Sequence, residues 1–149
     1  MKQFFDLLVV GEGELVLKDA IEYVISSKWE EEKIYCFKQC EDVNFFSNLK
    51  TPDFSDIVWS EYLSPVKILP ITVQRKCRWS KCDFCAIHSC WTCSAHDRKV
   101  SDVVKEIKKY AYEVNANYFR IVDEMVSAEY LYELSSQLIK TGFQIFFED

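Results

Sequence analysis

Cys77-Arg-Trp-Ser-Lys-Cys-Asp-Phe-Cys85 places three thiols within nine residues, directly after the apolar run Val66-Lys-Ile-Leu-Pro-Ile-Thr-Val73. The thiols of Cys77, Cys82 and Cys85 have the spacing C-x4-C-x2-C. Three thiolates on one short loop can hold three corners of an iron–sulfur cube and leave the fourth iron open to a ligand that is not protein. A closed structural metal site requires a fourth protein ligand. The spacing therefore favours a reactive cluster.

The main alternative to a cluster is zinc. Cys82-x2-Cys85 and Cys90-x2-Cys93 form two knuckles with a zinc-like spacing, and both histidines of the chain lie nearby. Only four residues separate the knuckles, whereas zinc ribbons usually have about 15–20 residues between their pairs. The short span favours the cluster over zinc. Cys90 and Cys93 could form an inert pair beside the cluster, a redox dithiol or ligands of a second metal, and we favour the inert pair.

Composition and charge indicate a folded protein of the cytoplasm. Of the 149 residues, 49% are hydrophobic and 28% are charged, with only three prolines and three glycines. The seven cysteines are an odd number, and Asp6 interrupts the N-terminal apolar stretch, unlike a signal peptide. We therefore expect reduced thiols and no disulfide framework. No apolar run reaches the roughly 18 residues of a membrane span, and a net charge of −6 gives no electrostatic reason to expect nucleic acid.

From residue 69 onward, hydrophobic patterning predicts alternating strands and helices. We expect strands at residues 69–74, 118–122 and 143–147, and helices at residues 101–114 and 127–141. Ser101 is a candidate N-cap for the first helix, and Gly142 is well placed to end the second. This alternation predicts a parallel sheet. No helix follows the last strand to cover it, and its three phenylalanines would invite aggregation on an unprotected edge.

The first third of the chain predicts a separate unit. Phe4 to Val10 is expected to form a strand, and a helix follows, with a short strand from Ile34 to Phe37. The apolar stripe of that helix comprises Leu17, Ala20, Ile21, Val24 and Ile25.

The thiol loop resembles the cluster loop of the radical S-adenosylmethionine (SAM) enzymes, in the form found in their cobalamin-domain-associated branch. Val10-Gly-Glu-Gly-Glu14 is similar to the G-E-G-E that closes the cobalamin-type domain of that branch. Thr51-Pro-Asp-Phe54 and Tyr62-Leu-Ser-Pro65 are similar to its approach to the barrel, and Tyr118-Phe-Arg-Ile-Val-Asp-Glu124 to its second barrel strand with an acidic end. The likeness runs in order along nearly the whole chain.

The resemblance implies an α/β chain containing an incomplete parallel (βα) barrel of the radical SAM type, with about three βα units, preceded by a small βα remnant of a Rossmann-like domain. Residues 1–26 would be the terminal βα unit of the cobalamin-type domain, residues 27–65 a bridging segment and residues 66–149 the first half of the barrel. Such a chain could be a fragment, the product of a split gene, or a small protein that is completed by a partner subunit or by self-association.

The resemblance also assigns the cofactors. Cys77, Cys82 and Cys85 would bind a [4Fe–4S] cluster whose fourth iron is chelated by SAM. One-electron cleavage of SAM then gives a 5′-deoxyadenosyl radical, chemistry that belongs to the cofactor. No cobalamin is expected, because the D-x-H-x-x-G motif that supplies its histidine ligand is absent from the sequence.

Three further residues are implicated by their places in the family pattern. Phe84 lies where the family has an aromatic residue beside adenine, and Asp123 and Glu124 lie where it has acceptors for the SAM amino group, with Glu124 favoured. The alternative for Phe84 is ordinary core packing, and for the two acids a solvated strand end.

The family resemblance implies a flavodoxin- or ferredoxin-like electron donor. The substrate and the catalytic residues stay open, as does activity in isolation, because substrate contacts in the family come largely from later strands. The alternative function is a non-catalytic zinc- or cluster-binding remnant, or a subunit that needs a partner.

Overall fold

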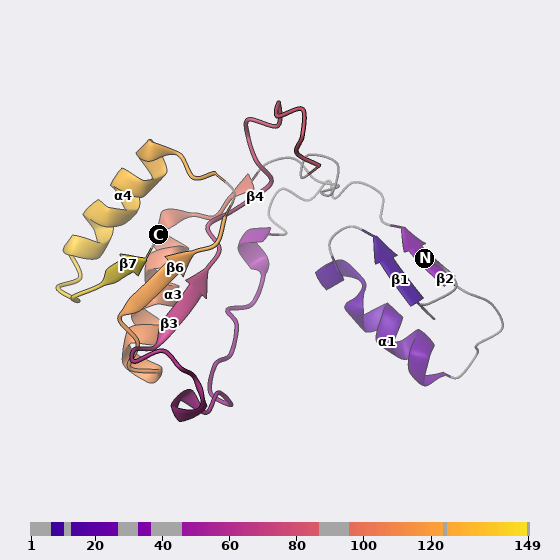
Figure 1. Ribbon diagram of the computed structural model, residues 1–149, viewed down its shortest axis with the longest axis horizontal. Coiled ribbons are helices and arrows are strands. Elements are labelled where there is room, and N and C mark those ends of the chain that lie inside the picture. The colour runs from indigo at the N-terminus through magenta and orange to yellow at the C-terminus, as the bar shows by residue number, and fades with distance from the viewer. Residues whose placement is uncertain are drawn as a thin grey trace. The chain divides into compact units, whose positions relative to one another are not determined.

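The computed structural model describes residues 7–10, 13–26, 33–36, 46–86, 96–123 and 125–148. These residues form a mixed α/β protein with three α-helices and a small parallel sheet of three strands (Figure 1). The chain divides into two compact units. The first comprises Met1–Asp42 and Ser80–Ser94, and the second comprises Val43–Trp79 and Ala95–Asp149.

The first unit contains a β–α–β arrangement. Strand β1 (Leu7–Val10) leads through a short 3-10 turn, η1 (Gly13–Leu15), into helix α1 (Leu17–Ile25), and strand β2 (Lys33–Cys36) pairs parallel with β1. The predicted strand and helix are thus confirmed where the structure describes them. The strand predicted at residues 34–37 begins one residue earlier and pairs with β1.

In α1, burial is limited to part of the predicted apolar stripe. Ala20 is buried, whereas Leu17, Ile21, Val24 and Ile25 are exposed.

The sheet of the second unit is parallel throughout, as predicted. It consists of β3 (Ile68–Ile71), β6 (Tyr118–Ile121) and β7 (Phe146–Glu148) in the order β3-β6-β7. Helix α3 (Val100–Glu113) precedes β6, and helix α4 (Ala128–Ile139) connects β6 to β7. Parallel strands require such crossover connections, which is why the alternating pattern fixes their direction.

The core of this unit lies between one face of the sheet and the two helices. Leu69 and Ile71 of β3 and Phe119 of β6 are fully buried, while Pro70 between the first two is exposed, as the two-residue period of a strand requires. The helices contribute buried residues at helical spacing, among them Val103, Ile107 and Tyr110 of α3 and Leu134 and Leu138 of α4. Each fully buried apolar side chain contributes roughly 1.5–3 kcal/mol to folding, so this cluster accounts for much of the stability of the unit.

The helix boundaries differ in detail from the predictions. Helix α3 begins at Val100 with Lys99 at its N-cap position and no side-chain cap, so the assignment of Ser101 as the N-cap is wrong. Ser127 does cap α4, because its side-chain oxygen accepts the N–H of Tyr130 at 3.2 Å. Gly142 follows α4 with φ of 73°, a left-handed conformation that confirms its predicted role as the terminator.

The buried side of α4 comprises Tyr130, Leu134 and Leu138, whereas the apolar side chains of Leu131 and Ile139 are exposed.

The predicted strand at residues 69–74 is two strands. After β3, the chain continues into β4 (Gln74–Arg75), which pairs antiparallel with β5 (His96–Asp97), a strand that was not predicted. The predicted strand at 143–147 begins later, at Phe146.

The segment that precedes the sheet packs on α3. It contains two short 3-10 turns, η2 (Phe46–Asn48) and η3 (Trp59–Glu61). The ring of Phe54 contacts Tyr110 edge-on at 5.2 Å between centroids, and the hydroxyl of Tyr110 donates to the carbonyl of Pro52 at 3.0 Å. No helix in the described ranges has the length and apolar character needed to cross a membrane.

Candidate functional site

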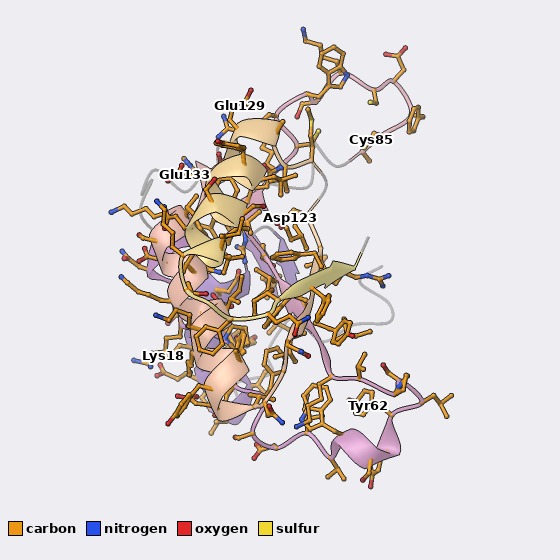
Figure 2. The ribbon with its side chains drawn as sticks, turned by 90° about the vertical axis from the view of Figure 1, so that its left-hand side faces the viewer. Lys18, Tyr62, Cys85, Asp123, Glu129 and Glu133 are labelled. Atoms are coloured by element: carbon orange, nitrogen blue, oxygen red, sulfur yellow. The ribbon has the colours of Figure 1, made fainter. Side chains whose placement is uncertain are left out.

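The carboxyl ends of the parallel strands define the candidate site. The thiol loop follows β3, and Asp123 follows β6, its neighbour in the sheet. Because parallel strands have their carboxyl ends on the same edge, the start of the loop and the acid lie close together. Figure 2 shows Asp123 on the inner side of α4, whereas Glu129 and Glu133 lie on the outer side of that helix.

The loop is closed at its base by a two-stranded stem. Gln74 pairs with Asp97, and Arg75 pairs with His96, so that residues 76–95 form the excursion between β4 and β5. The guanidinium of Arg78 binds the carboxylate of Asp97 at 2.6 Å, which adds an ion pair across the stem. The guanidinium of Arg75 also lies over the ring of the buried Phe46 at 5.0 Å.

Two residues in the loop have left-handed backbone conformations. Lys76, directly before Cys77, has φ of 66°, and Ser80 has φ of 45°. Such values are uncommon for residues other than glycine and mark sharp changes in chain direction. They lie on either side of Cys77 and turn the chain between the stem and the second thiol.

Cys82 and Cys85 occupy the two ends of one turn. The N–H of Cys85 donates to the carbonyl of Cys82 at 3.1 Å, which closes the turn. In a turn of this kind the Cα atoms of the first and fourth residues lie within about 7 Å of each other.

Cys77, Cys82 and Cys85 form no disulfide and are partly buried. Cys77 is counted with the second compact unit, and Cys82 and Cys85 with the first. In the part of the chain that the structure describes, no group of three or more histidine, cysteine, aspartate or glutamate side chains is arranged to hold a metal ion. By the chemistry of its donors, the loop fits a thiolate-bound cluster, because thiolates are the usual ligands of iron–sulfur clusters.

The side chain of Phe84 is 93% exposed. This exposure argues against the alternative that Phe84 packs in a core.

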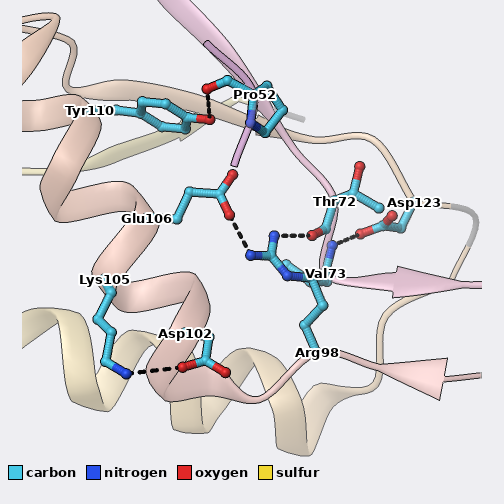
Figure 3. Close-up of polar contacts among 9 residues, drawn as sticks. All are labelled: Pro52, Thr72, Val73, Arg98, Asp102, Lys105, Glu106, Tyr110 and Asp123. Atoms are coloured by element: carbon cyan, nitrogen blue, oxygen red, sulfur yellow. Dashed lines mark hydrogen bonds and ion pairs between the residues drawn. The ribbon is translucent and has the colours of Figure 1, made fainter. Parts of the chain in front are cut away.

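The carboxylate of Asp123 is bound to the main chain before the loop. Its Oδ2 atom accepts the N–H of Val73 at 2.6 Å (Figure 3) and the N–H of Gln74 at 3.2 Å. The carbonyl of Ile71 in the same segment accepts the N–H of Val122 at 3.1 Å. The acid therefore joins the end of β6 to the segment between β3 and β4.

Arg98 binds the same segment through its carbonyl groups. Its Nη1 donates to the carbonyl of Thr72 at 3.0 Å (Figure 3), and its backbone N–H donates to the carbonyl of Val73 at 2.8 Å. Its Nη2 forms an ion pair with Glu106 of α3.

Sequence reasoning missed both Arg98 and Glu106. The signal that could have revealed Glu106 is its place on the apolar side of α3, three residues after Val103 and four before Tyr110. A carboxylate on such a face requires a partner.

Two tyrosines in this region are held in the neutral form. Burial, with the nearby carboxylate of Glu106, raises the pKa of Tyr110 far above its usual value. Burial likewise raises the pKa of Tyr130. Among the described residues, the hydroxyl of Tyr130, Nε2 of Gln74 and Oδ1 of Asp97 are buried without a hydrogen-bond partner. Buried atoms of this kind commonly bind ordered water.

Glu124, Cys90 and Cys93, which the sequence analysis singled out, lie outside the described ranges. Cys36 is the last residue of β2, and His96 lies in the stem.

The arrangement defines a mixed α/β protein whose thiol-rich loop begins at the carboxyl edge of a parallel sheet. Comparison of the chain with known protein families, curated proteins and solved structures finds no match.

Proposed function

We propose that this chain is a radical SAM protein that binds a [4Fe–4S] cluster through Cys77, Cys82 and Cys85. The observation that carries the proposal is that a loop with three thiols begins at the carboxyl end of one parallel strand, beside the acidic end of the next. Open α/β sheets commonly bind their ligands at this edge, which supports a cofactor site near the start of the loop and Asp123.

Different residues would bind the cluster and SAM. The turn from Cys82 to Cys85 would supply two thiolates side by side, and Cys77, close to the stem, would supply the third. The exposed ring of Phe84 is available to cover the adenine of SAM, and Glu124 is our candidate acceptor for the SAM amino group. When bound, the reduced cluster supplies the electron that cleaves SAM.

The proposal includes the finer fold and the partners. The three-stranded sheet would be the first half of a radical SAM barrel, completed by a partner subunit or by self-association, and the first unit a remnant of a Rossmann-like domain. A flavodoxin- or ferredoxin-like donor in the cytoplasm would reduce the cluster. Among the residues that the structure describes, β3 and β7 are the outer strands of the sheet and pair on one side only, which is consistent with completion by further strands.

Electron paramagnetic resonance of the anaerobically reconstituted, dithionite-reduced protein, with and without SAM, tests the proposal. We expect a [4Fe–4S] signal that shifts when SAM is added, because SAM would coordinate the open iron. A signal that SAM does not move would overturn the catalytic proposal and leave a cluster-binding remnant.

Matched cysteine variants identify the ligands. Cys77→Ser, Cys82→Ser and Cys85→Ser should each abolish the signal, whereas the double variant Cys90→Ser/Cys93→Ser should keep both the signal and its shift. Loss of the signal in the double variant would mean that the second cysteine pair holds the metal.

Zinc is the second candidate, and the closed turn at Cys82–Cys85 is the observation that favours it, since structural zinc sites commonly take two thiolates from a C-x2-C pair. About one zinc per chain, with no iron taken up, would establish this alternative and exclude radical chemistry at the loop.

A further inference from the structure

The segment between β3 and β4 is held from both sides by side chains that are distant in sequence. Asp123, which lies 50 residues after Val73, accepts the amide N–H groups of Val73 and Gln74. Arg98 donates to the carbonyls of Thr72 and Val73. Hydrogen bonds to an ionised side chain are stronger than those between neutral groups.

This segment is the attachment point of the thiol loop. Gln74 begins the stem, and Cys77 lies only two residues beyond the end of β4. Arg98 directly follows β5, the other strand of the stem, and is itself anchored by Glu106 of α3. Both ends of the loop are therefore fixed to the sheet and to α3, and the position of Cys77 depends on this attachment.

We propose that Asp123 is a positioning residue for the thiol loop. It acts through the backbone of Val73 and Gln74, and it holds the stem so that Cys77 is presented at the carboxyl edge of the sheet. This divides the acidic pair at the end of β6 between two tasks: Asp123 orders the loop, and the SAM amino group is left to Glu124. The second task rests on the function proposed above, whereas the first does not need a cluster.

The oxygen atoms of Asp123 are the part of the side chain that this role requires. Asp123→Asn keeps an oxygen that can accept both amides and removes the charge, whereas Asp123→Ala removes the acceptor. A residue that binds the SAM ammonium through its charge would lose function in both variants. Asp123→Asn therefore distinguishes a role in positioning the loop from a role in binding SAM.

The first measurement uses the cluster-free chain. Hydrogen exchange by NMR should show the amides of Val73 and Gln74 exchanging at least about tenfold faster in Asp123→Ala, which corresponds to a loss of about 1.4 kcal/mol of protection. Asp123→Asn should lie within about threefold of the wild type, and Glu124→Gln should leave these amides unchanged. Wild-type protection in Asp123→Ala would overturn the proposal.

Alkylation of the thiols gives a second cluster-free measurement. Iodoacetamide labelling followed by mass spectrometry should show Cys77 reacting faster in Asp123→Ala than in the wild type. Cys82 and Cys85, which come later in the chain after β4, should change less and serve as internal controls. An equal change at all three thiols would indicate general unfolding and count against a specific role. Should Asp123→Ala fail to fold, Asp123→Ser takes its place, because its shorter side chain withdraws the acceptor from the two amides.

The reconstituted protein separates this proposal from the proposed function. Asp123→Asn should keep both the cluster signal and its shift with SAM, while Glu124→Gln keeps the signal and loses the shift. If Asp123→Asn loses the SAM shift with normal amide protection, Asp123 is a ligand-binding acid and the positioning role is wrong. If the wild type takes up no cluster, the proposed function fails, and amide protection and Cys77 alkylation still decide the role of Asp123.

Discussion

Arg98 and Glu106 form an ion pair that is almost entirely withdrawn from water, with side chains 12% and 3% exposed. The pair joins the residue after the stem to the buried side of α3. Breaking a buried pair is costly because it leaves one charge unpaired, whereas replacing both partners by apolar residues often costs little.

We therefore expect Arg98→Met to lower the free energy of unfolding by about 3–5 kcal/mol, because Glu106 would be left buried and unpaired. The double variant Arg98→Met/Glu106→Met should be more stable than the single variant. Urea denaturation measures both. The exposed pair of Lys105 and Asp102, 3.0 Å apart, is the control, and Lys105→Met should change stability by less than about 0.5 kcal/mol. If the double variant loses as much free energy of unfolding as Arg98→Met and Glu106→Met lose together, this account is wrong.

A matched pair of tyrosine substitutions should have different effects on the free energy of unfolding. Tyr110→Phe removes the hydrogen bond to the carbonyl of Pro52 and should destabilise the protein by about 1 kcal/mol. Tyr130→Phe removes a buried hydroxyl that has no partner among the residues described, and should leave stability unchanged or raise it by up to about 1 kcal/mol. Thermal and urea unfolding of the two variants make the comparison. A loss above about 1 kcal/mol in Tyr130→Phe would show that its hydroxyl is hydrogen-bonded in solution.

The same tyrosines predict the response of stability to high pH. Burial raises the pKa of Tyr110 and of Tyr130 above the usual value of about 10. Above about pH 10 the unfolded chain loses these protons while the folded chain keeps them, so the stability that the neutral tyrosines contribute is complete below that pH and declines as the pH rises.

Denaturation at a series of pH values between about 9 and 12 tests this linkage. The loss of stability with rising pH should be smaller in Tyr110→Phe/Tyr130→Phe than in the wild type. Exposed Tyr132 provides the control, since Tyr132→Phe should follow the wild-type curve. Identical curves for all three proteins would mean that the two buried tyrosines ionise normally.

Substitution of a phenylalanine in the core should affect stability far more than substitution of one in the thiol loop. Phe119 is fully buried in the central strand, whereas Phe84 is 93% exposed. Phe119→Ala should cost about 3–5 kcal/mol through lost burial and the cavity left behind, and Phe84→Ala should change stability by less than about 0.5 kcal/mol.

The effect of Phe84→Ala should instead appear as a weaker SAM-induced change in the cluster signal. Titration with SAM, followed by electron paramagnetic resonance, measures it. An unchanged SAM response would exclude the adenine contact.

The architecture of the second unit could be predicted because its determinants are local. The apolar spacing of α3 and α4, the short apolar strands and Gly142 each act over a few residues, and alternating strands and helices allow few arrangements other than a parallel sheet. Element ends were less predictable. The N-cap of α3 is Lys99 rather than Ser101, because the backbone turns into the helix before the best capping side chain.

The spacing of Cys77, Cys82 and Cys85 is equally local, so the amino-acid order alone indicated a thiol loop and the chemistry that it favours. The stem that closes the loop was decided by tertiary structure, because β4 and β5 are each only two residues long and carry no periodic signal. The partners of Asp123 lie about 50 residues earlier in the chain, and Arg98 meets Thr72 and Glu106 only when the sheet and α3 are assembled. Hydrogen bonds and ion pairs between distant segments leave no pattern in residue spacing, since they depend on which strand ends the fold brings to one edge.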